Sequence, residues 1–425
     1  MRLRSLFIVS IVVCPLALAA RAQNLDLPAV PLPASEPTAP SLWFTPAELA
    51  SVQARRASTS SAAHYNAVKG FVNGNLAGLK SNPSGQSDDT LTLLTKGAGL
   101  LQALGETPPA NTFATYRDAA VSALTHVANR ETTQLINNPS DAIDALHDSP
   151  RLQSMCEGYD LLRGSGVSQS DDTAMRNKLD QWAQALHDDY NLVGLPSFGI
   201  PGHRDNWGIK AGSALITCAL AMSSHAHASG WMTFGNTLVH DSFAITGSDA
   251  GWYRESAHYL NYALDDAFST AVHVKKRTGV DWFAKLSVYA SAALDLRQPD
   301  GSEADFEEGV PCVFPFDVFA PFVGDLGGQL AWAWSHSSKD TDSWPNQQFA
   351  EATQFLAGDL PDPIAPAGRP SRFVGGDAHI AALRSGFDSK AVQATLFNAR
   401  DYSNSTLVSS RHDMQNPLDF TLAAL

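Results

Sequence analysis

Apolar residues recur every three or four positions from residue 46 to about residue 345, which is the period of an amphipathic helix. Polar or glycine-rich breaks separate these periodic segments, and no strong strand alternation interrupts them. Thr45, Pro46 and Glu48 have the form of a capping box with proline at the first helical position, so the first helix should begin there. The pattern predicts helices over 46–57, 61–79, 87–104, 112–129, 140–163, 169–190, 207–226, 229–243, 253–278 and 280–296, with more beyond 318.

This number of helices, paired by short turns, predicts a mainly α fold built as a toroid of helix hairpins or as an α-solenoid. The sequence has no repeat of fixed period, which disfavours a regular solenoid. Longer loops recur between the paired helices, and a toroid with a cleft at one end accounts for them better. We therefore expect an incomplete (α/α) toroid over residues 41–357.

The pattern changes after about residue 357. Residues 358–370, with LPDPIAPAGRP at 360–370, have the composition of a linker. Short β-like runs follow at 379–385, 391–397, 405–410 and 418–422. These runs predict a short antiparallel sheet over residues 371–425. The sequence stops at an apolar run, so we expect either a truncated sheet or one that packs on the helical domain.

The first residues have the features of a secretory signal peptide. Arg2 and Arg4 precede an apolar stretch, and Ala20-Arg21-Ala22 places cleavage before Gln23. The apolar stretch is too short for a membrane span, and no later stretch is long enough. We expect residues 1–22 to be removed, residues 23–40 to form a Pro-rich leader, and the protein to be periplasmic or secreted.

Charge and cysteine content narrow the classes of partner. The whole chain has a formal charge of −14, and loss of the three arginines in the signal leaves 26 basic residues against 43 acidic ones, or −17. This balance argues against nucleic acid or anionic lipid as a partner. An acidic sugar stays possible because His and Arg can cluster locally. Cys156, Cys218 and Cys312 have no metal-ligand spacing and allow at most one disulfide.

The first candidate site is the segment 202–207 (GHRDNW), where a glycine- and proline-rich loop enters a long helix. Asn206 and Trp207 should lie near that helix N-terminus, where backbone N–H groups and the helix dipole favour an anion. The Asn206 amide can donate two hydrogen bonds to a carboxylate. Alternatively, Asp205 or Asn206 is simply the N-cap of the helix.

The second candidate site is the segment 249–262, which begins as a Gly-containing turn and continues as a helix. Glu255, Tyr259 and Tyr262 share one helix face, with Arg254 and His258 on the adjoining stripe. A phenol near a cation can accept a proton as a base and return it as an acid. Alternatively, the two tyrosines are core aromatics.

Two further segments carry weaker signals. The acidic loop at 297–309 surrounds a Pro-Asp-Gly turn and is either a cation site or, as we favour, a solvated turn. His147 and Arg151 fall in another long helical pattern and could extend a cleft.

Taken together, these segments resemble the heparinase II/III and alginate lyase superfamily of polysaccharide lyases, over most of the chain after residue 41. The motifs that carry the resemblance are Asn206-Trp207, DAGWYRESAHY at 249–259, PDGS at 299–302, AALRSGFD at 381–388 and HDMQNPLDFTL at 412–422. The family pairs an (α/α) toroid with a C-terminal antiparallel β-sandwich. The resemblance implies that Asn206 and His203 neutralise a uronate carboxylate while Tyr259 moves the proton. It also implies substrate contacts, which we expect from Arg204, Trp207, Arg254, Glu255, His258 and His412.

The C-terminal motif departs from the family pattern. A His-x-His-x-Asp stretch, with ligands to a structural metal nearby, is common there, whereas this chain has His412, Met414 and Asn416. Met and Asn are poor replacements for an imidazole and a carboxylate at a hard or borderline cation. We therefore predict no bound metal and no other cofactor.

The resulting prediction is an exported polysaccharide lyase that cleaves a uronate-containing acidic polysaccharide by β-elimination. One alternative is a glycoside hydrolase on the same kind of toroid, with Asp205 and Glu255 as its two carboxylates. Another is a family member that binds sugar without turnover. The sequence carries no signal for the oligomeric state.

Overall fold

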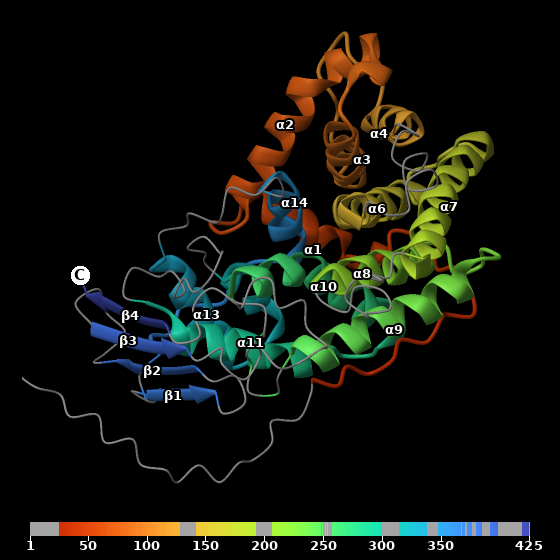
Figure 1. Ribbon diagram of the computed structural model, residues 1–425. Coiled ribbons are helices and arrows are strands. Elements are labelled where there is room, and N and C mark those ends of the chain that lie inside the picture. The colour runs from red at the N-terminus through yellow and green to blue at the C-terminus, as the bar shows by residue number, and fades with distance from the viewer. Residues whose placement is uncertain are drawn as a thin grey trace, which may run out of the picture.

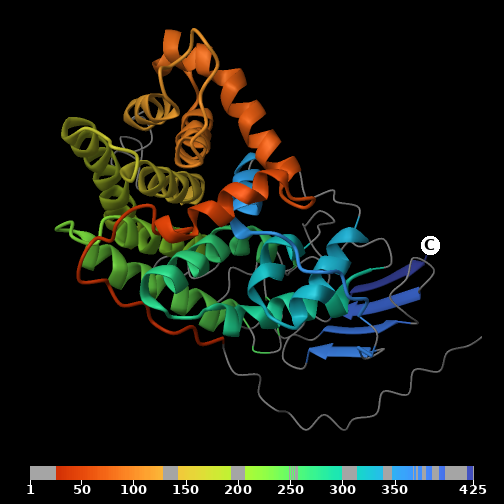
Figure 2. The same ribbon diagram turned by 180° about the vertical axis from the view of Figure 1, so that it is seen from behind.

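The computed structural model shows a mainly α-helical chain that ends in a small antiparallel sheet (Figures 1 and 2). It describes residues 25–127, 142–192, 206–247, 249, 251, 253, 257–298, 314–337, 347–366, 368–369, 372–375, 380–384, 392–397 and 419–424. Side chains are described for a smaller set within these ranges.

The predicted helices are all present. The first consists of a 3₁₀ turn (Pro46–Glu48), α1 (Leu49–Ala54) and a second 3₁₀ turn (Arg55–Ala57). The Glu48 carboxylate accepts a hydrogen bond from the Thr45 backbone N–H at 2.8 Å, as the capping box predicts. The others are α2 (Ala62–Ser81), α3 (Asp88–Ala103), α4 (Tyr116–His126), α6 (Ala142–Arg163), α7 (Gln169–Leu192), α8 (Asn206–Ala221), α9 (Ala228–Thr246), α10 (Ala257–Thr278), α11 (Phe283–Leu296), α12 (Phe316–Phe319), α13 (Leu326–Ser335) and α14 (Gln347–Ala357).

The helices α3 and α6 lie side by side and run in the same direction. Asp89 of α3 pairs with Arg151 of α6 at 2.8 Å, and Lys96 of α3 pairs with Glu157 of α6 at 2.5 Å. Both residue numbers increase together from one contact to the next, so the two helices are parallel.

The same argument shows that α8 and α10 are parallel. Lys210 of α8 pairs with Asp266 of α10 at 2.7 Å, and one and a half to two turns further along Thr217 contacts His273 at 3.2 Å. The helix α6 also packs against α8. The helices α3, α6, α8 and α10 therefore form an inner row of parallel helices. The chain returns between them through α4, α7 and α9, which pack against α3, α6 and α8. This is the hairpin arrangement of an incomplete (α/α) toroid.

Residues 25–44 form an extended N-terminal strap that runs along the outside of these helices. They are extended, as the Pro-rich composition predicts, but Leu25, Leu27 and Val30 are buried. The Val30 backbone N–H donates to the Asn236 side chain at 2.8 Å, and the Trp282 indole donates to the Pro28 carbonyl at 2.8 Å. The strap is thus a packed part of the domain, which composition alone did not indicate.

Four strands follow the helices: β1 (Arg372–Gly375), β2 (Ile380–Arg384), β3 (Val392–Phe397) and β4 (Asp419–Ala424). They pair antiparallel in chain order. The sheet lies beside α11 and α13 (Figure 1), and the Arg384 guanidinium donates to the Leu294 carbonyl of α11. The sheet therefore packs on the helical domain, one of the two arrangements expected. The strand β1 was not predicted, and the predicted run at 405–410 lies outside the described residues.

Three other predictions concern export and cysteines. Residues 1–22, the expected signal peptide, lie outside the described residues. Within the part of the chain that the structure describes, no helix is both long and apolar enough to cross a bilayer. Cys156 and Cys218 are buried free thiols, and Cys312 falls outside the described part.

Candidate active site at the N-terminal ends of the inner helices

The two ends of the inner row differ in how they are covered. At the C-terminal ends, the Asp160 carboxylate accepts the backbone N–H groups of Ser41 and Leu42 from the strap, at 2.7 and 2.8 Å. Arg277 and Arg163 donate to the last carbonyls of α8, at 2.7 and 3.1 Å, where a cation complements the helix dipole. The strap and these hydrogen bonds close this end of the toroid.

The N-terminal ends of α6, α8 and α10 lie together at the opposite end, because the three helices are parallel. Each is preceded by a segment outside the described residues: 128–141, 193–205 and 254–256. Both candidate segments of the sequence analysis enter helices at this end. The fold thus brings together Asn206, at the start of α8, and Tyr259, in the first turn of α10.

Asn206 is the first residue of α8 and is only 1 % exposed. The helix is apolar on almost every side, as expected for one surrounded by other helices. Its amide is therefore held by the packing of a central helix rather than by a surface loop. Trp207, beside it, is half-buried.

Lys210 lies one turn after Asn206 and is fully buried. Its ammonium group is 2.7 Å from the Asp266 carboxylate and 3.7 Å from the centre of the Tyr262 ring. Burial alone would lower the pKa of Lys210, but Asp266, Tyr262 and Asp265 together outweigh it and raise the pKa. Gln153 of α6 donates to the Asp266 backbone carbonyl at 3.0 Å, so three inner helices meet at this pair.

The contact between Lys210 and Asp266 sets the register of α8 and α10. One turn back from each residue lie Asn206 and Tyr262, so these two are level with each other. Tyr259 lies nearly one turn closer to the N-terminal end of α10 and is half-buried. Burial raises the pKa of Tyr262, with the neighbouring acids adding to the effect and Lys210 opposing it. Tyr262 therefore stays protonated and lies at the same height as Asn206, with its ring over the Lys210 ammonium group.

Two carboxyl groups near this cluster have a raised pKa: Asp265 of α10, which is exposed, and Asp317, which is buried. Desolvation of its carboxyl group raises the pKa of Asp265 to about 7, with Lys210 opposing the shift and Asp266 and Asp317 adding to it. Burial also raises the pKa of Asp317, on α12, to about 6. The Gln354 side chain of α14 donates to Asp317 at 2.5 Å. Groups that titrate near neutral pH in a buried setting are candidates for acid–base chemistry.

A second ionic cluster lies one to two turns deeper. Lys96 pairs with Glu157, whose other oxygen is 3.4 Å from the ring of His273. Lys96 also donates to Thr353 of α14 at 3.0 Å. Burial, helped by Lys96, holds the pKa of His273 well below its usual range, so the imidazole is neutral. This cluster joins α3, α6, α10 and α14. It lies between the Lys210–Asp266 pair and the end of the toroid where the strap binds Asp160.

Several predicted site residues cannot be placed. His203, Arg204, Asp205, Arg254, Glu255 and His412 lie outside the described residues, as does most of the acidic loop at 297–309. His258 and His147 lie within α10 and α6, but their side chains are not described. Arg151 pairs with Asp89 and with Asp148, at 2.8 and 3.1 Å, so it ties α6 to α3.

The sequence analysis missed the buried lysine–carboxylate pairs. The signal that could have found them is a single charged residue within an apolar helix: Lys210 in NWGIKAGSALITCALA and Lys96 in LTLLTKGAGLL. Such a lysine needs a buried acid nearby, because an unpaired ammonium group inside a protein is very unfavourable. The sequence does not show which acid pairs with it.

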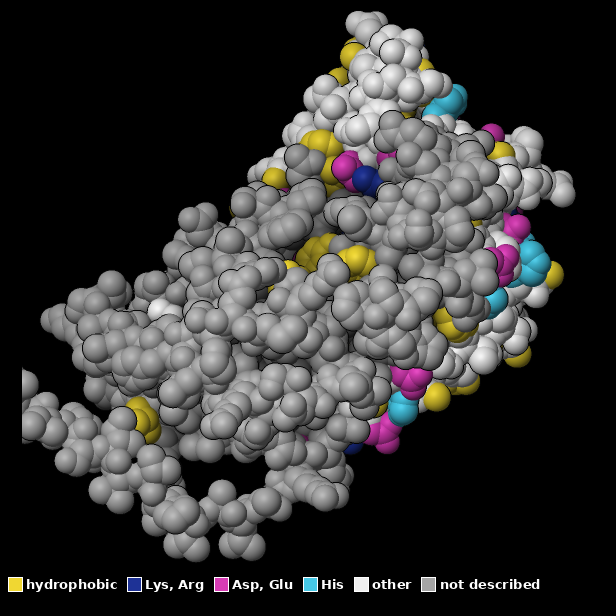
Figure 3. Space-filling model, viewed as in Figure 1, with side chains coloured by type: hydrophobic (Ala, Val, Ile, Leu, Met, Phe, Trp, Pro, Cys, Tyr) yellow, Lys and Arg dark blue, Asp and Glu magenta, His cyan; other side chains and the backbone are white. Residues whose placement is uncertain are grey.

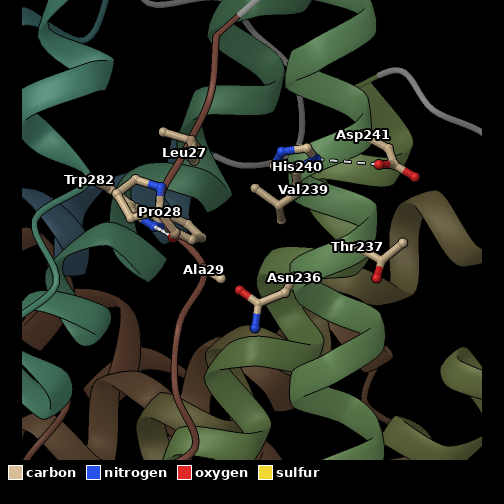
Figure 4. Close-up of a pocket in the computed structure, with 9 residues that line it drawn as sticks. All are labelled: Leu27, Pro28, Ala29, Asn236, Thr237, Val239, His240, Asp241 and Trp282. Atoms are coloured by element: carbon tan, nitrogen blue, oxygen red, sulfur yellow. Dashed lines mark hydrogen bonds and ion pairs between the residues drawn. The ribbon is translucent and has the colours of Figure 1, made fainter.

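A 210 Å³ pocket lies elsewhere, where residues 27–29 of the strap face α9 and Trp282 (Figure 4). His240 and Asp241 point toward each other at its rim, and Asn236 lies at its other end. None of the predicted site residues lines it. It is a gap between the strap and the outer helices, apart from the cluster around Asn206.

Comparison with known proteins yields no match to any protein-family model and none to a curated protein. Among solved structures, the chain is similar to a heparinase III, with 16% identity over 81% of this chain and 50% of that one and a TM-score of 0.46. A second heparinase III has 12% identity over 82% and 56%, with a TM-score of 0.43. A mutant of the heparan sulfate lyase HepC from Pedobacter heparinus has 15% identity over 73% and 45%, with a TM-score of 0.41. The chain spans about half the length of these proteins.

Proposed function

We propose that this protein is an exported polysaccharide lyase that cleaves a uronate-containing polysaccharide by β-elimination. The observation that carries the proposal is the placement of Asn206 and Tyr259 on neighbouring parallel helices, at the end opposite the one where Ser41 and Leu42 of the strap bond Asp160. The motifs around both residues, which resemble those of heparinase II/III-like lyases, support it independently.

The chemistry follows from the acidity of the substrate. A C5 proton next to a carboxylate is very weakly acidic until that carboxylate is neutralised. Hydrogen bonds from Asn206, with help from His203, stabilise the enolate that develops when the proton leaves. Tyr259 takes the C5 proton, the C4–O bond breaks, and the phenol returns the proton to the departing oxygen. The products are a chain with a new reducing end and a chain whose non-reducing end is a uronyl residue with a C4=C5 double bond.

The buried pair of Lys210 and Asp266 has a positioning role in this scheme. It fixes the register of α8 against α10 and so sets the distance between the Asn206 amide and the Tyr259 phenol. The Tyr262 ring, stacked over the Lys210 ammonium group, fills the space below.

Lyase action is tested by incubating the purified chain with alginate, heparan-type and other uronate polymers and following the ultraviolet absorbance of the unsaturated product. Asn206→Ala should lower kcat about 100- to 1,000-fold, as for loss of an oxyanion donor. Tyr259→Phe should lower it about 100- to 10,000-fold. If both variants cleave the best substrate at the wild-type rate, the assignment is wrong.

Matched controls lie elsewhere in the fold. Tyr159→Phe removes a phenol that bonds Asp172 at 2.8 Å, and Asn75→Ala removes an amide that bonds the Phe71 carbonyl at 2.8 Å. Both should keep wild-type kcat. A similar loss of activity in the controls would indicate general destabilisation instead.

A glycoside hydrolase is the second candidate, and the raised pKa of Asp265 favours it, since a carboxyl group that titrates near 7 can act as a general acid. The carboxylates expected from the sequence for this reaction, Asp205 and Glu255, lie outside the described residues. A hydrolase would release reducing ends without ultraviolet absorbance, and Asp265→Asn would abolish that release. The same assay therefore separates the two functions.

A further inference from the structure

A cluster of metal-ligating side chains lies on the outer face of the molecule, where α7 meets the turn between α8 and α9. The Asp180 carboxylate of α7 is 2.7 Å from Nδ1 of His227 and 3.7 Å from Nδ1 of His225. One ligand atom from each of the three residues lies within 4.8 Å of the other two. Figure 3 shows histidine and acidic side chains gathered at this edge.

The turn holds the two imidazoles in place. The His225 backbone N–H donates to the Met222 carbonyl at 2.8 Å, and His227 is the N-cap residue of α9. The Trp231 ring stacks on His225, with ring centres 5.2 Å apart and planes 9° from parallel. The Trp231 indole donates to Gln184 of α7 at 3.2 Å, which fixes the turn against the helix that carries Asp180. The Nδ1 atoms of both rings therefore lie near the carboxylate, and the His227 backbone N–H donates to Nδ1 of His225 at 3.4 Å.

We propose that Asp180, His225 and His227 bind one divalent transition-metal ion of the Zn²⁺ class. Zinc takes imidazole nitrogen and carboxylate oxygen at about 2.0–2.2 Å, which puts ligand atoms roughly 3.3 Å apart around a tetrahedral ion. The distances from the Asp180 carboxylate to the two Nδ1 atoms, 2.7 and 3.7 Å, lie on either side of this ligand separation. Three protein ligands leave one position for water. Imidazole donors favour Zn²⁺, Ni²⁺ and Cu²⁺ over Mg²⁺ and Ca²⁺.

The ion would join α7 to the turn between α8 and α9. His187 and Asp188 of α7 form a neighbouring pair at 2.9 Å and add negative charge on the same side. The turn follows the C-terminal end of α8, which the strap covers, whereas Asn206 is at the opposite end of that helix. The site is therefore independent of the proposed lyase activity. The sequence did not predict this site, because Asp180 comes close to His225 and His227 only in the folded chain.

The test uses the full chain after treatment with EDTA. Titration with Zn²⁺ by calorimetry should show one site with a Kd of about micromolar or lower, and the midpoint of thermal unfolding should rise by a few degrees. Mg²⁺ should have no effect. His225→Ala with His227→Ala should remove binding, and so should Asp180→Asn, which preserves the side-chain shape.

The control is His240→Ala. His240 is exposed. Its Nε2 is 3.1 Å from Asp26 and its Nδ1 is 3.4 Å from Asp241, on opposite sides of the ring, so one ion cannot bind the imidazole and both carboxylates. This variant should bind Zn²⁺ as wild type does. Unchanged Zn²⁺ binding in Asp180→Asn would overturn the proposal. Co²⁺ bound to the wild-type chain provides a measurement that needs no variant: no tetrahedral visible absorption at one equivalent would also overturn it.

Discussion

Lys210 and Lys96 are charged residues in the interior of helices whose other residues are mostly apolar. Each is buried, and each is paired with a carboxylate from the next inner helix, Asp266 and Glu157. A buried ion pair gains little over an apolar pair of the same volume, but loss of one partner leaves an uncompensated charge. These pairs therefore select one register between parallel helices, since any slip would separate them.

The first prediction concerns Lys210→Met. The variant leaves the Asp266 carboxylate buried without its cation, so the free energy of unfolding should fall by about 3–5 kcal/mol. The double variant with Asp266→Asn should lose less than the sum of the two single variants. Urea unfolding measures all three. The exposed Lys285→Met is the control and should change stability by less than about 0.5 kcal/mol. Additive losses would show that the pair does not couple α8 to α10.

The second prediction concerns the pH dependence that Asp265 causes. Its pKa in the folded chain is about 7, above the ordinary 3.8, so the folded state holds this proton more tightly than the unfolded state. The contribution to stability is complete below pH 4 and is lost as the pH rises through 7. Asp265→Asn cannot ionise and should escape that loss. Because Asp265 is exposed and water screens its charge, the gain relative to wild type between pH 4 and pH 8 should be small, on the order of 1 kcal/mol.

Urea unfolding at a series of pH values measures this difference. Asp317, whose pKa is raised to about 6, titrates in the same range but is present in both proteins. The exposed Asp362→Asn is the control and should follow the wild-type curve. Parallel curves for wild type and Asp265→Asn would contradict the prediction.

At the scale of elements, α8 and α9 approach closely because each has a glycine at the contact. A Cβ atom on Gly212 would lie 2.6 Å from a Val239 methyl and 2.7 Å from the Gly235 carbonyl oxygen. A Cβ on Gly235 would lie 2.8 Å from the Gly212 carbonyl oxygen. No real Cβ can occupy such positions, so the spacing of this hairpin depends on both glycines.

The third prediction compares two Gly→Ala variants. Gly212→Ala should lower the free energy of unfolding by about 1–3 kcal/mol or more, because α9 must move outward. Gly74→Ala should instead raise it by up to about 1 kcal/mol, since that glycine is exposed on α2 with open space around it and alanine favours the helix. Thermal or urea unfolding reports both signs. If both variants were stabilised, the contact between α8 and α9 would have room for a Cβ atom at residue 212, contrary to the prediction.

Helical period predicted every long helix up to Leu296 because each buries one or more faces in a single large core. It did not predict β1 (Arg372–Gly375), whose four residues are too few to show an alternation. The start of α8 at Asn206 could be predicted from the loop composition. The pairing of Lys210 with Asp266 could not be predicted, because residues 56 positions apart meet only through helix packing.

At the scale of the whole molecule, the formal charge of −14 opposes the approach of a long polyanion. The fourth prediction is that the KM of the proposed lyase for a uronate polymer falls several-fold as NaCl rises from 10 to 150 mM. The screening length shortens from about 30 to about 8 Å over that range, which weakens the repulsion. Initial rates at several salt concentrations measure it. A short uronate oligosaccharide should show a weaker dependence, and a KM that rises with salt would indicate a basic cleft that outweighs the net charge.

The N-terminal strap also affects the order in which the chain can fold during synthesis. Pro28 finds its partner at Trp282, 254 residues later, and Val30 finds Asn236, 206 residues later. The first described segment to leave the ribosome is therefore among the last to reach its native contacts. Contacts at such separation form slowly, and until they do the apolar residues of the strap stay open to chaperones. The fold thus delays its own completion until most of the chain has been made.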